Sequence, residues 1–220
     1  QLMEYRKQEI VEIVALETGK SPRDAASEAQ AAIELGYFIA GEGRRFYGQT
    51  STSVTPNRFA YTTRQPIGVC ALITSFNTPI ANAAWKAFPA LLCGNSVIMK
   101  PSEHTPYSAI WFAKILKEAG LPAGVFSVIQ GDAKTGEFLV KNRNVNLVSC
   151  TGSVATGKYI QTTAGSRLVR ICLELGGKNP LVVCDDCDID WAVECAVLSA
   201  FSNAGQRCSS TSRIIVFDSI

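Results

Sequence analysis

The sequence predicts an α/β fold in which helices cover both faces of a doubly wound parallel sheet. Between residues 67 and 173, short apolar runs alternate with longer segments of helical character. The apolar runs lack the polar alternation of half-exposed strands, so they are expected to pair in parallel inside the molecule. In such sheets ligands bind beyond the carboxyl ends of the strands, and polar residues at those ends are the candidates for a site.

Composition indicates a globular chain and argues against two kinds of partner. With 220 residues, of which 47% are apolar and 18% charged, the chain can bury a sizeable core. The net charge of +2 is too small for a nucleic-acid surface, and no apolar run approaches the ~18 residues that span a bilayer. We therefore expect neither nucleic acid nor a membrane as a partner. Because the first residue is Gln1 and not Met, we expect a piece of a longer protein, and a targeting segment stays open.

The first fifty residues are predicted to be helical. Apolar residues recur near helical spacing from Leu2 to Leu16, and Gly19 is expected to end that helix. Ser21-Pro22 has the composition of a helix start, and it opens a second helix that is expected to run through residues 25–40.

Residues 49–65 differ in character from the helices before them. They are rich in Thr and Ser, with Pro56-Asn57 in the middle, which predicts two strands around a turn. A hairpin that stands off the main body has free edges, and proteins usually cover such edges. We therefore expect the hairpin to contact another copy of the chain in a homo-oligomer, either a dimer or a tetramer.

From Pro66 onward, strands and helices alternate regularly. Strands are predicted at 67–74, 95–99, 125–129, 145–150 and 168–173, and helices at 78–92, 106–119, 132–141 and 154–165. Beyond them, a second α/β unit is expected to begin with a strand at 180–184, a helix at 188–203 and a strand at 213–217.

Eight cysteines are spread along the chain, most of them inside apolar runs. There they are expected to be small hydrophobic residues in a reducing compartment, which favours the cytoplasm. Cys184 and Cys187 have the spacing of a zinc half-site, with Cys195 further on. No second pair follows, and the single histidine, His104, is far away in the sequence, so we expect no metal.

Residues 152–158, GSVATGK, match seven positions of the phosphate loop Gly-x-x-x-x-Gly-Lys-[Ser/Thr]. The eighth position carries a magnesium-ligating hydroxyl in that motif, and here it is Tyr159, whose hydroxyl lies too far out on a rigid ring. The remaining interpretations are a phosphate-binding turn of another kind and a plain Gly-rich bend.

Polar clusters follow the predicted strands, and a further cluster follows the next helix. They are SFNTP at 75–79, KPSEHTP at 100–106, TGSVATG at 151–157, LELGGKNP at 173–180 and NAGQRCSS at 203–210. In this order and at these separations they resemble the NAD(P)-dependent aldehyde dehydrogenase superfamily, over the whole chain. The resemblance implies a Rossmann-like cofactor domain over residues 1–174, which includes the hairpin, and the truncated N-terminal part of a catalytic domain over residues 175–220.

The resemblance implies three catalytic residues. Cys208 matches the nucleophile that forms a thiohemiacetal and then a thioester, and the charge of the adjacent Arg207 favours a reactive thiolate. Asn77 matches the donor that, with the backbone N–H of the nucleophile, stabilises the oxyanion. Glu174 matches the general base for thioester hydrolysis, and partial desolvation would raise its pKa toward neutrality. Without the context of these motifs, the alternative for Cys208 is a buried thiol. For Asn77 it is a turn or helix-cap residue, and for Glu174 it is an ordinary glutamate at a strand end.

The resemblance also implies a set of cofactor-binding residues. Lys100 and Glu103 are expected to contact the adenosine ribose, and a carboxylate there disfavours the extra phosphate of NADP, so NAD is expected, with NADP as the alternative. Gly152 and Ser153 are expected near the pyrophosphate at a helix N-terminus. Phe76 stands where the family usually has Trp, so the apolar contact is expected without the indole hydrogen bond. The full set is Thr74, Phe76, Lys100, Ser102, Glu103, Gly152 and Ser153.

Three functions follow from the resemblance and stay open at this point. The first is an oxidoreductase that converts an aldehyde to its carboxylic acid with NAD(P). The second is an acylating relative that passes the acyl group to coenzyme A and has little need of Glu174 as a base. The third is a catalytically inactive cofactor-binding fragment. The aldehyde itself is not determined, although Arg207 would suit a semialdehyde acid if its guanidinium lines the substrate tunnel. The alternatives for Arg207 are that it turns outward to pair with a structural carboxylate, or that it acts only by lowering the pKa of the Cys208 thiol.

Overall fold

The computed structural model describes residues 1–220 and has the predicted α/β architecture. A five-stranded sheet has the order β5-β4-β3-β6-β7, and all four of its strand pairs are parallel. Its strands are β3 (Val69–Ile73), β4 (Ser96–Lys100), β5 (Phe126–Val128), β6 (Leu147–Gly152) and β7 (Arg170–Leu175). The chain builds outward from β3 to β5 and then returns to add β6 and β7 on the other side. The order therefore reverses between β3 and β6, where open sheets of this kind bind ligands.

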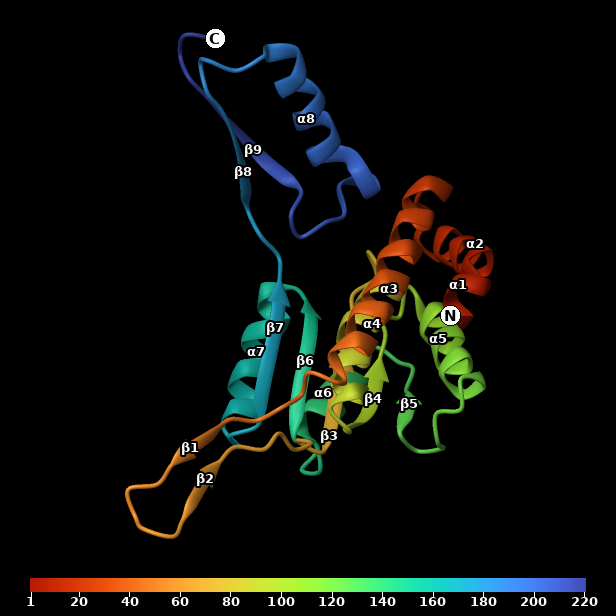
Figure 1. Ribbon diagram of the computed structural model, residues 1–220. Coiled ribbons are helices and arrows are strands. Elements are labelled where there is room, and N and C mark those ends of the chain that lie inside the picture. The colour runs from red at the N-terminus through yellow and green to blue at the C-terminus, as the bar shows by residue number, and fades with distance from the viewer.

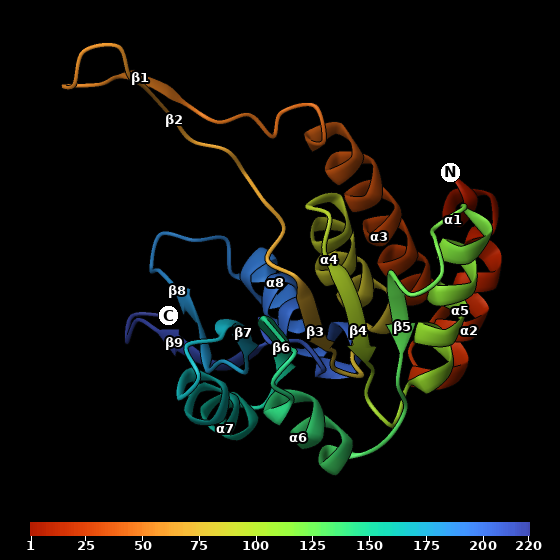
Figure 2. The same ribbon diagram turned by 90° about the horizontal axis from the view of Figure 1, so that it is seen from below.

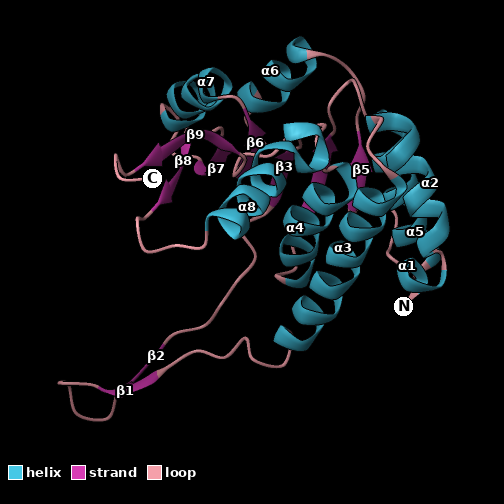
Figure 3. Ribbon diagram, turned by 90° about the horizontal axis from the view of Figure 1, so that it is seen from above, coloured by secondary structure: helices cyan, strands magenta, loops and turns pink.

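Helices cover the two faces of this sheet in separate layers (Figure 2, Figure 3). One layer contains α1 (Leu2–Tyr5), α2 (Lys7–Thr18), α3 (Pro22–Glu42), α4 (Pro79–Leu92) and α5 (Pro106–Glu118), and the other contains α6 (Ala133–Lys141) and α7 (Val154–Gly165). The larger core cluster lies under the first layer and includes Ile10, Ile80 and Phe112, all fully buried. A smaller cluster around Val148 and Ile160 lies under the second layer.

The N-terminal helices have the predicted start and stop residues. Gly19 ends α2 in the left-handed conformation at φ 69°, which glycine adopts without steric cost. Ser21 caps α3 by accepting the Asp24 N–H, with Pro22 at the first helical position. The expectation of one helix from Leu2 was wrong in detail, because the chain breaks at Arg6 (φ −104°) and forms a separate short turn first.

The hairpin of residues 49–65 projects away from the sheet (Figure 1). Its strands β1 (Thr50–Thr52) and β2 (Phe59–Tyr61) pair with each other alone and are exposed along their whole length. Apolar side chains at Val54, Phe59 and Tyr61 are also exposed there. This segment therefore contributes nothing to the core of the chain.

A second, smaller unit follows β7 at the opposite end of the sheet from the hairpin (Figure 1). Strands β8 (Asn179–Val183) and β9 (Thr211–Val216) form a two-stranded parallel sheet, connected by helix α8 (Ile189–Phe201) and a short 3₁₀ turn. None of the α8 residues is buried. The predicted division into domains at residue 174 stays a prediction. A search of the helices for a membrane-spanning segment finds no candidate.

Two expectations about burial were wrong. Strand β7 alternates between half-buried and exposed residues, so α7 covers its Ile171 face while the face of Cys172 and Glu174 is open. Only Cys70 and Cys150 are buried among the eight cysteines, all of which are free thiols. Cys172 is exposed because α7 packs on the opposite face of β7.

Candidate active site

All ten residues predicted for the site line a single cavity of about 920 Å³. Many of its lining residues follow the carboxyl ends of β3, β4, β6 and β7. The chain passes from β7 into the second unit at this edge of the sheet (Figure 1). The ten residues are Thr74, Phe76, Asn77, Lys100, Ser102, Glu103, Gly152, Ser153, Glu174 and Cys208. Arg207 and His104 line it as well. The structure thus brings together segments that lie more than a hundred residues apart in the sequence.

Asn77 lies in the turn after β3, and hydrogen bonds hold both ends of its side chain. Its Oδ1 accepts from Ser75 Oγ at 2.7 Å, and its Nδ2 donates to the Gln206 carbonyl at 2.8 Å. The residue at the N-cap of α4 is Thr78, so Asn77 is not the helix cap that was its alternative role. An amide nitrogen carries two N–H groups, and the Gln206 bond uses one of them. The other can donate to an oxygen atom in the cavity.

The segment that carries Cys208 follows an unusual backbone turn. Asn203, Ala204 and Gly205 have φ angles of 55°, 56° and 70°, all in the left-handed region. For residues other than glycine this conformation costs roughly 1–2 kcal/mol each, so the surrounding contacts must hold it. The buried Asn203 side chain supplies two of them, by donating to the carbonyls of Asn77 (3.3 Å) and Gln206 (3.2 Å).

A second contact holds Cys208 from the other side. Its backbone carbonyl accepts from Asn179 Nδ2 at 2.6 Å. Gly177 passes close to the same carbonyl, and a Cβ at that position would be 3.0 Å from the oxygen. The Cys208 side chain itself is exposed to the cavity. The thiol is therefore accessible to a small molecule while its backbone is fixed.

Glu174 is on the open face of β7 and lines the cavity with an exposed side chain. The partial desolvation that we expected for this carboxylate is therefore absent from the structure.

Lys86 of α4 is a neighbouring charged group that the sequence did not lead us to predict, and it donates to Ser149 Oγ at 2.9 Å. Burial lowers the pKa of Lys86, and the negative charge of the Glu174 carboxylate opposes that effect. The sequence contained a signal for this residue, because Lys86 is the one charged side chain in the otherwise uncharged helix α4.

Lys100 and Phe76 also line the cavity. Lys100 is 4% exposed and is therefore not a solvated lysine, although it lies at the end of a strand. Its ammonium donates to the Pro101 carbonyl at 2.7 Å and lies 3.9 Å from a Glu103 oxygen. Burial lowers its pKa, and the carboxylates of Glu103 and Asp132 act in the opposite direction. Phe76 meets His104 edge to face, with 6.0 Å between ring centroids.

Helix α7 begins at the cavity, directly after Gly152 and Ser153. Ser153 caps it by accepting the Thr156 N–H at 3.1 Å. Gly157 and Lys158 lie inside this helix, so the triphosphatase loop is excluded. Gly157 instead lets α7 approach β7, because a Cβ there would be 2.6 Å from a Leu175 methyl carbon. The first amides of α7 are left to face an anion. The structure gathers no three His, Cys, Asp or Glu side chains that could hold a metal ion.

Known proteins match this chain in sequence along its whole length. The profile described as "Aldehyde dehydrogenase family" matches residues 1–220. The chain is 42% identical over 220 residues to 4-trimethylaminobutyraldehyde dehydrogenase B of Danio rerio, and the aligned region covers 100% of this chain and 42% of that protein. It is 43% identical over 216 residues to a betaine aldehyde dehydrogenase of Rhizobium johnstonii, which covers 98% of this chain and 44% of that protein.

Solved structures match its fold as well. A betaine aldehyde dehydrogenase of Staphylococcus aureus in complex with NAD+ superposes with a TM-score of 0.97 at 35% identity, over 99% of this chain and 43% of that one. An NADP-dependent enzyme of E. coli superposes with a TM-score of 0.95 at 38% identity, over 99% of this chain and 46% of that one. The chain therefore spans less than half the length of the relatives that it matches.

Proposed function

The chain belongs to the aldehyde dehydrogenase family, and from that premise we propose that it carries the cofactor site and the nucleophile of an NAD(P)-dependent oxidoreductase that converts an aldehyde to its carboxylic acid. One observation supports this most strongly. Asn77, Glu174 and Cys208 come from three separate parts of the chain and line the same cavity. They are an oxyanion donor, a carboxylate base and a soft nucleophile, which are the groups that this reaction requires.

In the first step the Cys208 thiolate adds to the carbonyl carbon of the aldehyde. The carbonyl oxygen then becomes an oxyanion, and two donors of this chain are available for it: the remaining N–H of Asn77 and the backbone N–H of Cys208. Donors of this kind act in the transition state, and removing one typically costs about 10²–10³ in rate. The Gln206 bond keeps the Asn77 amide beside the Cys208 segment and so limits its reorganisation.

Three observations support the binding of a dinucleotide in this cavity. The α7 N-terminus presents backbone N–H groups that suit a pyrophosphate. The Lys100 ammonium and the exposed Glu103 carboxylate suit ribose hydroxyls, and Glu103 would repel a 2′-phosphate, which favours NAD over NADP. Phe76 and His104 give an edge of two aromatic rings. When bound, NAD(P) would accept the hydride that leaves the carbon attached to Cys208.

Loss of that hydride leaves a thioester on Cys208, and water must hydrolyse it. Glu174 is the carboxylate of this chain that lines the cavity from the β7 side, so we assign it the removal of a proton from the attacking water. The carbon–sulfur bond then breaks, the carboxylic acid forms, and the thiolate of Cys208 is restored. If coenzyme A were the acceptor in place of water, this base would have no comparable task.

In this proposal the site prefers an aldehyde of a particular charge. The relatives named above act, by their names, on trimethylammonium-bearing or betaine aldehydes, which are cations. Arg207 places a guanidinium at the cavity beside Cys208, which favours an aldehyde with a carboxylate at its far end. On the position of Arg207 we propose a semialdehyde acid as the finer assignment.

The projecting hairpin, with its exposed apolar side chains, supports assembly into a homo-oligomer. The eight free thiols support a reducing, cytoplasmic location.

A steady-state assay of the complete protein tests the proposed function. Neutral, cationic and anionic aldehydes of equal chain length are supplied with NAD or NADP, with and without coenzyme A, and the reduced cofactor and the acid are both quantified. The proposal expects one carboxylic acid per reduced cofactor, without any requirement for coenzyme A. A strict requirement for coenzyme A, with the thioester of coenzyme A as the product, would establish the acylating alternative.

A further inference from the structure

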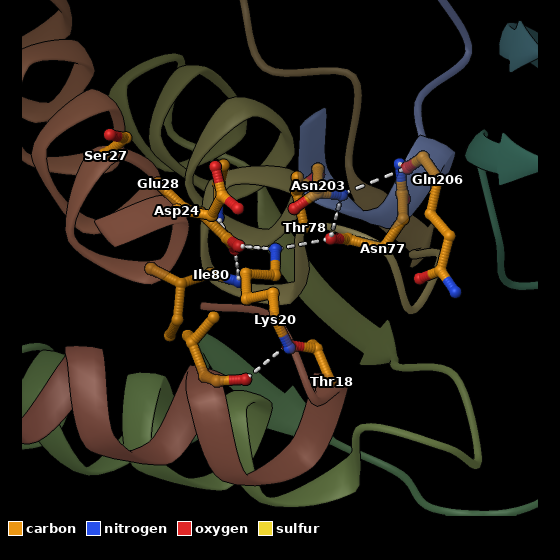
Figure 4. Close-up of polar contacts among 12 residues, drawn as sticks. Thr18, Lys20, Asp24, Ser27, Glu28, Asn77, Thr78, Ile80, Asn203 and Gln206 are labelled. Atoms are coloured by element: carbon orange, nitrogen blue, oxygen red, sulfur yellow. Dashed lines mark hydrogen bonds and ion pairs between the residues drawn. The ribbon is translucent and has the colours of Figure 1, made fainter. Parts of the chain in front are cut away.

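A buried ion pair outside the cavity holds the backbone of Asn77. Lys20 lies in the turn between α2 and α3, and Glu28 lies on α3. The Lys20 ammonium is 2.6 Å from Glu28 Oε2 and donates a second hydrogen bond of 2.6 Å to the Asn77 carbonyl (Figure 4). Both charged side chains are only 3% exposed. The pair therefore connects the N-terminal helices directly to the turn that carries Asn77.

Glu28 also caps helix α4, because the helix does not cap itself. Thr78 at the N-cap makes no side-chain cap hydrogen bond. Glu28 Oε1 instead accepts the backbone N–H of Ile80 at 2.8 Å (Figure 4). It also accepts the backbone N–H of Ala81 at 3.1 Å. A carboxylate at this place satisfies two orphan donors and is favoured by the helix dipole. Glu28 thus fixes the start of α4, which follows Asn77 in the chain, and fixes Lys20 at the same time.

The Asn77 carbonyl is shared with the segment that carries Cys208. It accepts the Lys20 ammonium and also the Asn203 side-chain amide, which donates to the Gln206 carbonyl as well (Figure 4). The Gln206 carbonyl accepts Asn77 Nδ2 in turn. The backbone oxygen and the side-chain amide of Asn77 are therefore both tied to residues 203–206. A shift of this carbonyl would move the amide relative to Cys208.

Stability alone does not account for this arrangement. Removing two charges from water is costly, and replacing a buried ion pair with apolar side chains is often neutral or stabilising. Apolar side chains in place of Lys20 and Glu28, however, could neither hold the Asn77 carbonyl nor cap α4. The distinctive effect of the pair is therefore on the position of Asn77.

We infer that Lys20, held by Glu28, is a positioning residue that sets the place of the Asn77 amide relative to Cys208 during oxyanion formation. The inference rests on the proposed function. Lys20 does not line the cavity, so it acts on the reaction through Asn77. Misplacement of a catalytic group by about 1 Å can cost about a hundredfold in rate. A smaller displacement, with Asn77 still present, is expected to cost about tenfold.

A double-mutant cycle in the complete protein tests this role. Lys20→Met is made in the unmodified protein and in Asn77→Ala, and the single-turnover rate of NAD(P)H formation is measured at saturating aldehyde and cofactor. If Lys20 acts through Asn77, the rate falls about tenfold in the first background and less than about twofold in the second, because coupled residues are not additive. Cofactor affinity, measured by fluorescence, should stay within about twofold.

The chain offers a matched control. Lys7 also joins α2 to α3, by a 2.7 Å hydrogen bond to Gln30, and none of its hydrogen bonds or ion pairs reaches the Asn77 turn. Lys7→Met should leave the single-turnover rate unchanged in both backgrounds. If Lys20→Met does not fold, the double substitution Lys20→Met with Glu28→Gln takes its place in the cycle, because it leaves no buried charge without a partner. The amide introduced by Glu28→Gln would still offer a carbonyl oxygen to the start of α4.

Two outcomes of the rate measurement would overturn the inference and leave the proposed function intact. One is an unchanged rate in Lys20→Met, and the other is an equal loss in the two backgrounds, which a merely structural role produces. Failure of both Lys20 variants to fold would assign the pair to stability and overturn it as well. If the unmodified complete protein forms no NAD(P)H from any aldehyde, the inference and the proposed function fall together.

Discussion

The side-chain amide of Asn77 donates a 2.8 Å hydrogen bond to the backbone carbonyl of Gln206, two residues before Cys208. The two bonded residues are 129 positions apart, one after the first strand of the large sheet and the other after α8. This contact brings the proposed oxyanion donor to the proposed nucleophile. The left-handed turn at 203–205 and the Lys20–Glu28 pair support it from either side. Catalysis as proposed depends on this relationship.

Glu174→Gln should separate the two halves of the reaction. The amide cannot take a proton from water, so hydrolysis of the thioester slows, while hydride transfer does not need this base. We expect a rapid burst of NAD(P)H that approaches one per active site, followed by a steady rate lowered about 10²–10⁴-fold. Stopped-flow absorbance measures both phases. If the burst disappears along with the steady rate, Glu174 acts in attack or in cofactor placement and is not a base for hydrolysis alone.

The eight thiols should differ in their reaction with iodoacetamide. Burial raises the pKa of Cys70 and of Cys150 to about 11, so both remain protonated and unreactive up to about pH 9. Cys208 is exposed to the cavity and should be alkylated first near neutral pH. Peptide mapping by mass spectrometry over time gives the order. Cys172 and Cys184 serve as exposed references outside the cavity lining, and faster modification of either one would contradict the assignment.

Arg207→Met tests the charge preference of the substrate. Methionine keeps much of the length and apolar stem of the side chain while it removes the guanidinium. If Arg207 pairs with a carboxylate of the substrate, KM for anionic semialdehydes should rise about ten- to a hundredfold, as expected for ~1.5–3 kcal/mol of charge-assisted hydrogen bonding. KM for neutral aldehydes of equal length should change little. An equal loss for both classes would show that Arg207 is structural or acts on the thiol.

The sheet was predictable because its strands are apolar on both sides along most of their length. The predicted strand at 67–74 contains β3 at 69–73, and the other four lie within about two residues of the observed strands. Burial was less predictable. Whether Cys172 is covered depends on which helix lies over the outer face of β7, and the local sequence of β7 does not contain that information.

The site was predictable as a set of residues but not as a network. Strand-end positions and motif order indicated Asn77, Glu174 and Cys208, and all three line the cavity. The support around them depends on backbone geometry that has little local signal: Ala204 adopts a left-handed conformation that alanine rarely favours. Lys20 follows a helix-ending glycine and would be taken for a solvated turn residue, yet its ammonium is buried against Glu28 and the Asn77 carbonyl.

The most direct test of the central claim is to identify the residue that carries the acyl group. The complete protein with Glu174→Gln is mixed with NAD(P) and an aldehyde, quenched in acid as the burst ends, digested and mapped by mass spectrometry. The proposed reaction predicts an acyl thioester on Cys208, and no acylated cysteine when Cys208→Ala is added to the same protein. An acyl group on another cysteine, or a burst of NAD(P)H without any acylated cysteine, would contradict it.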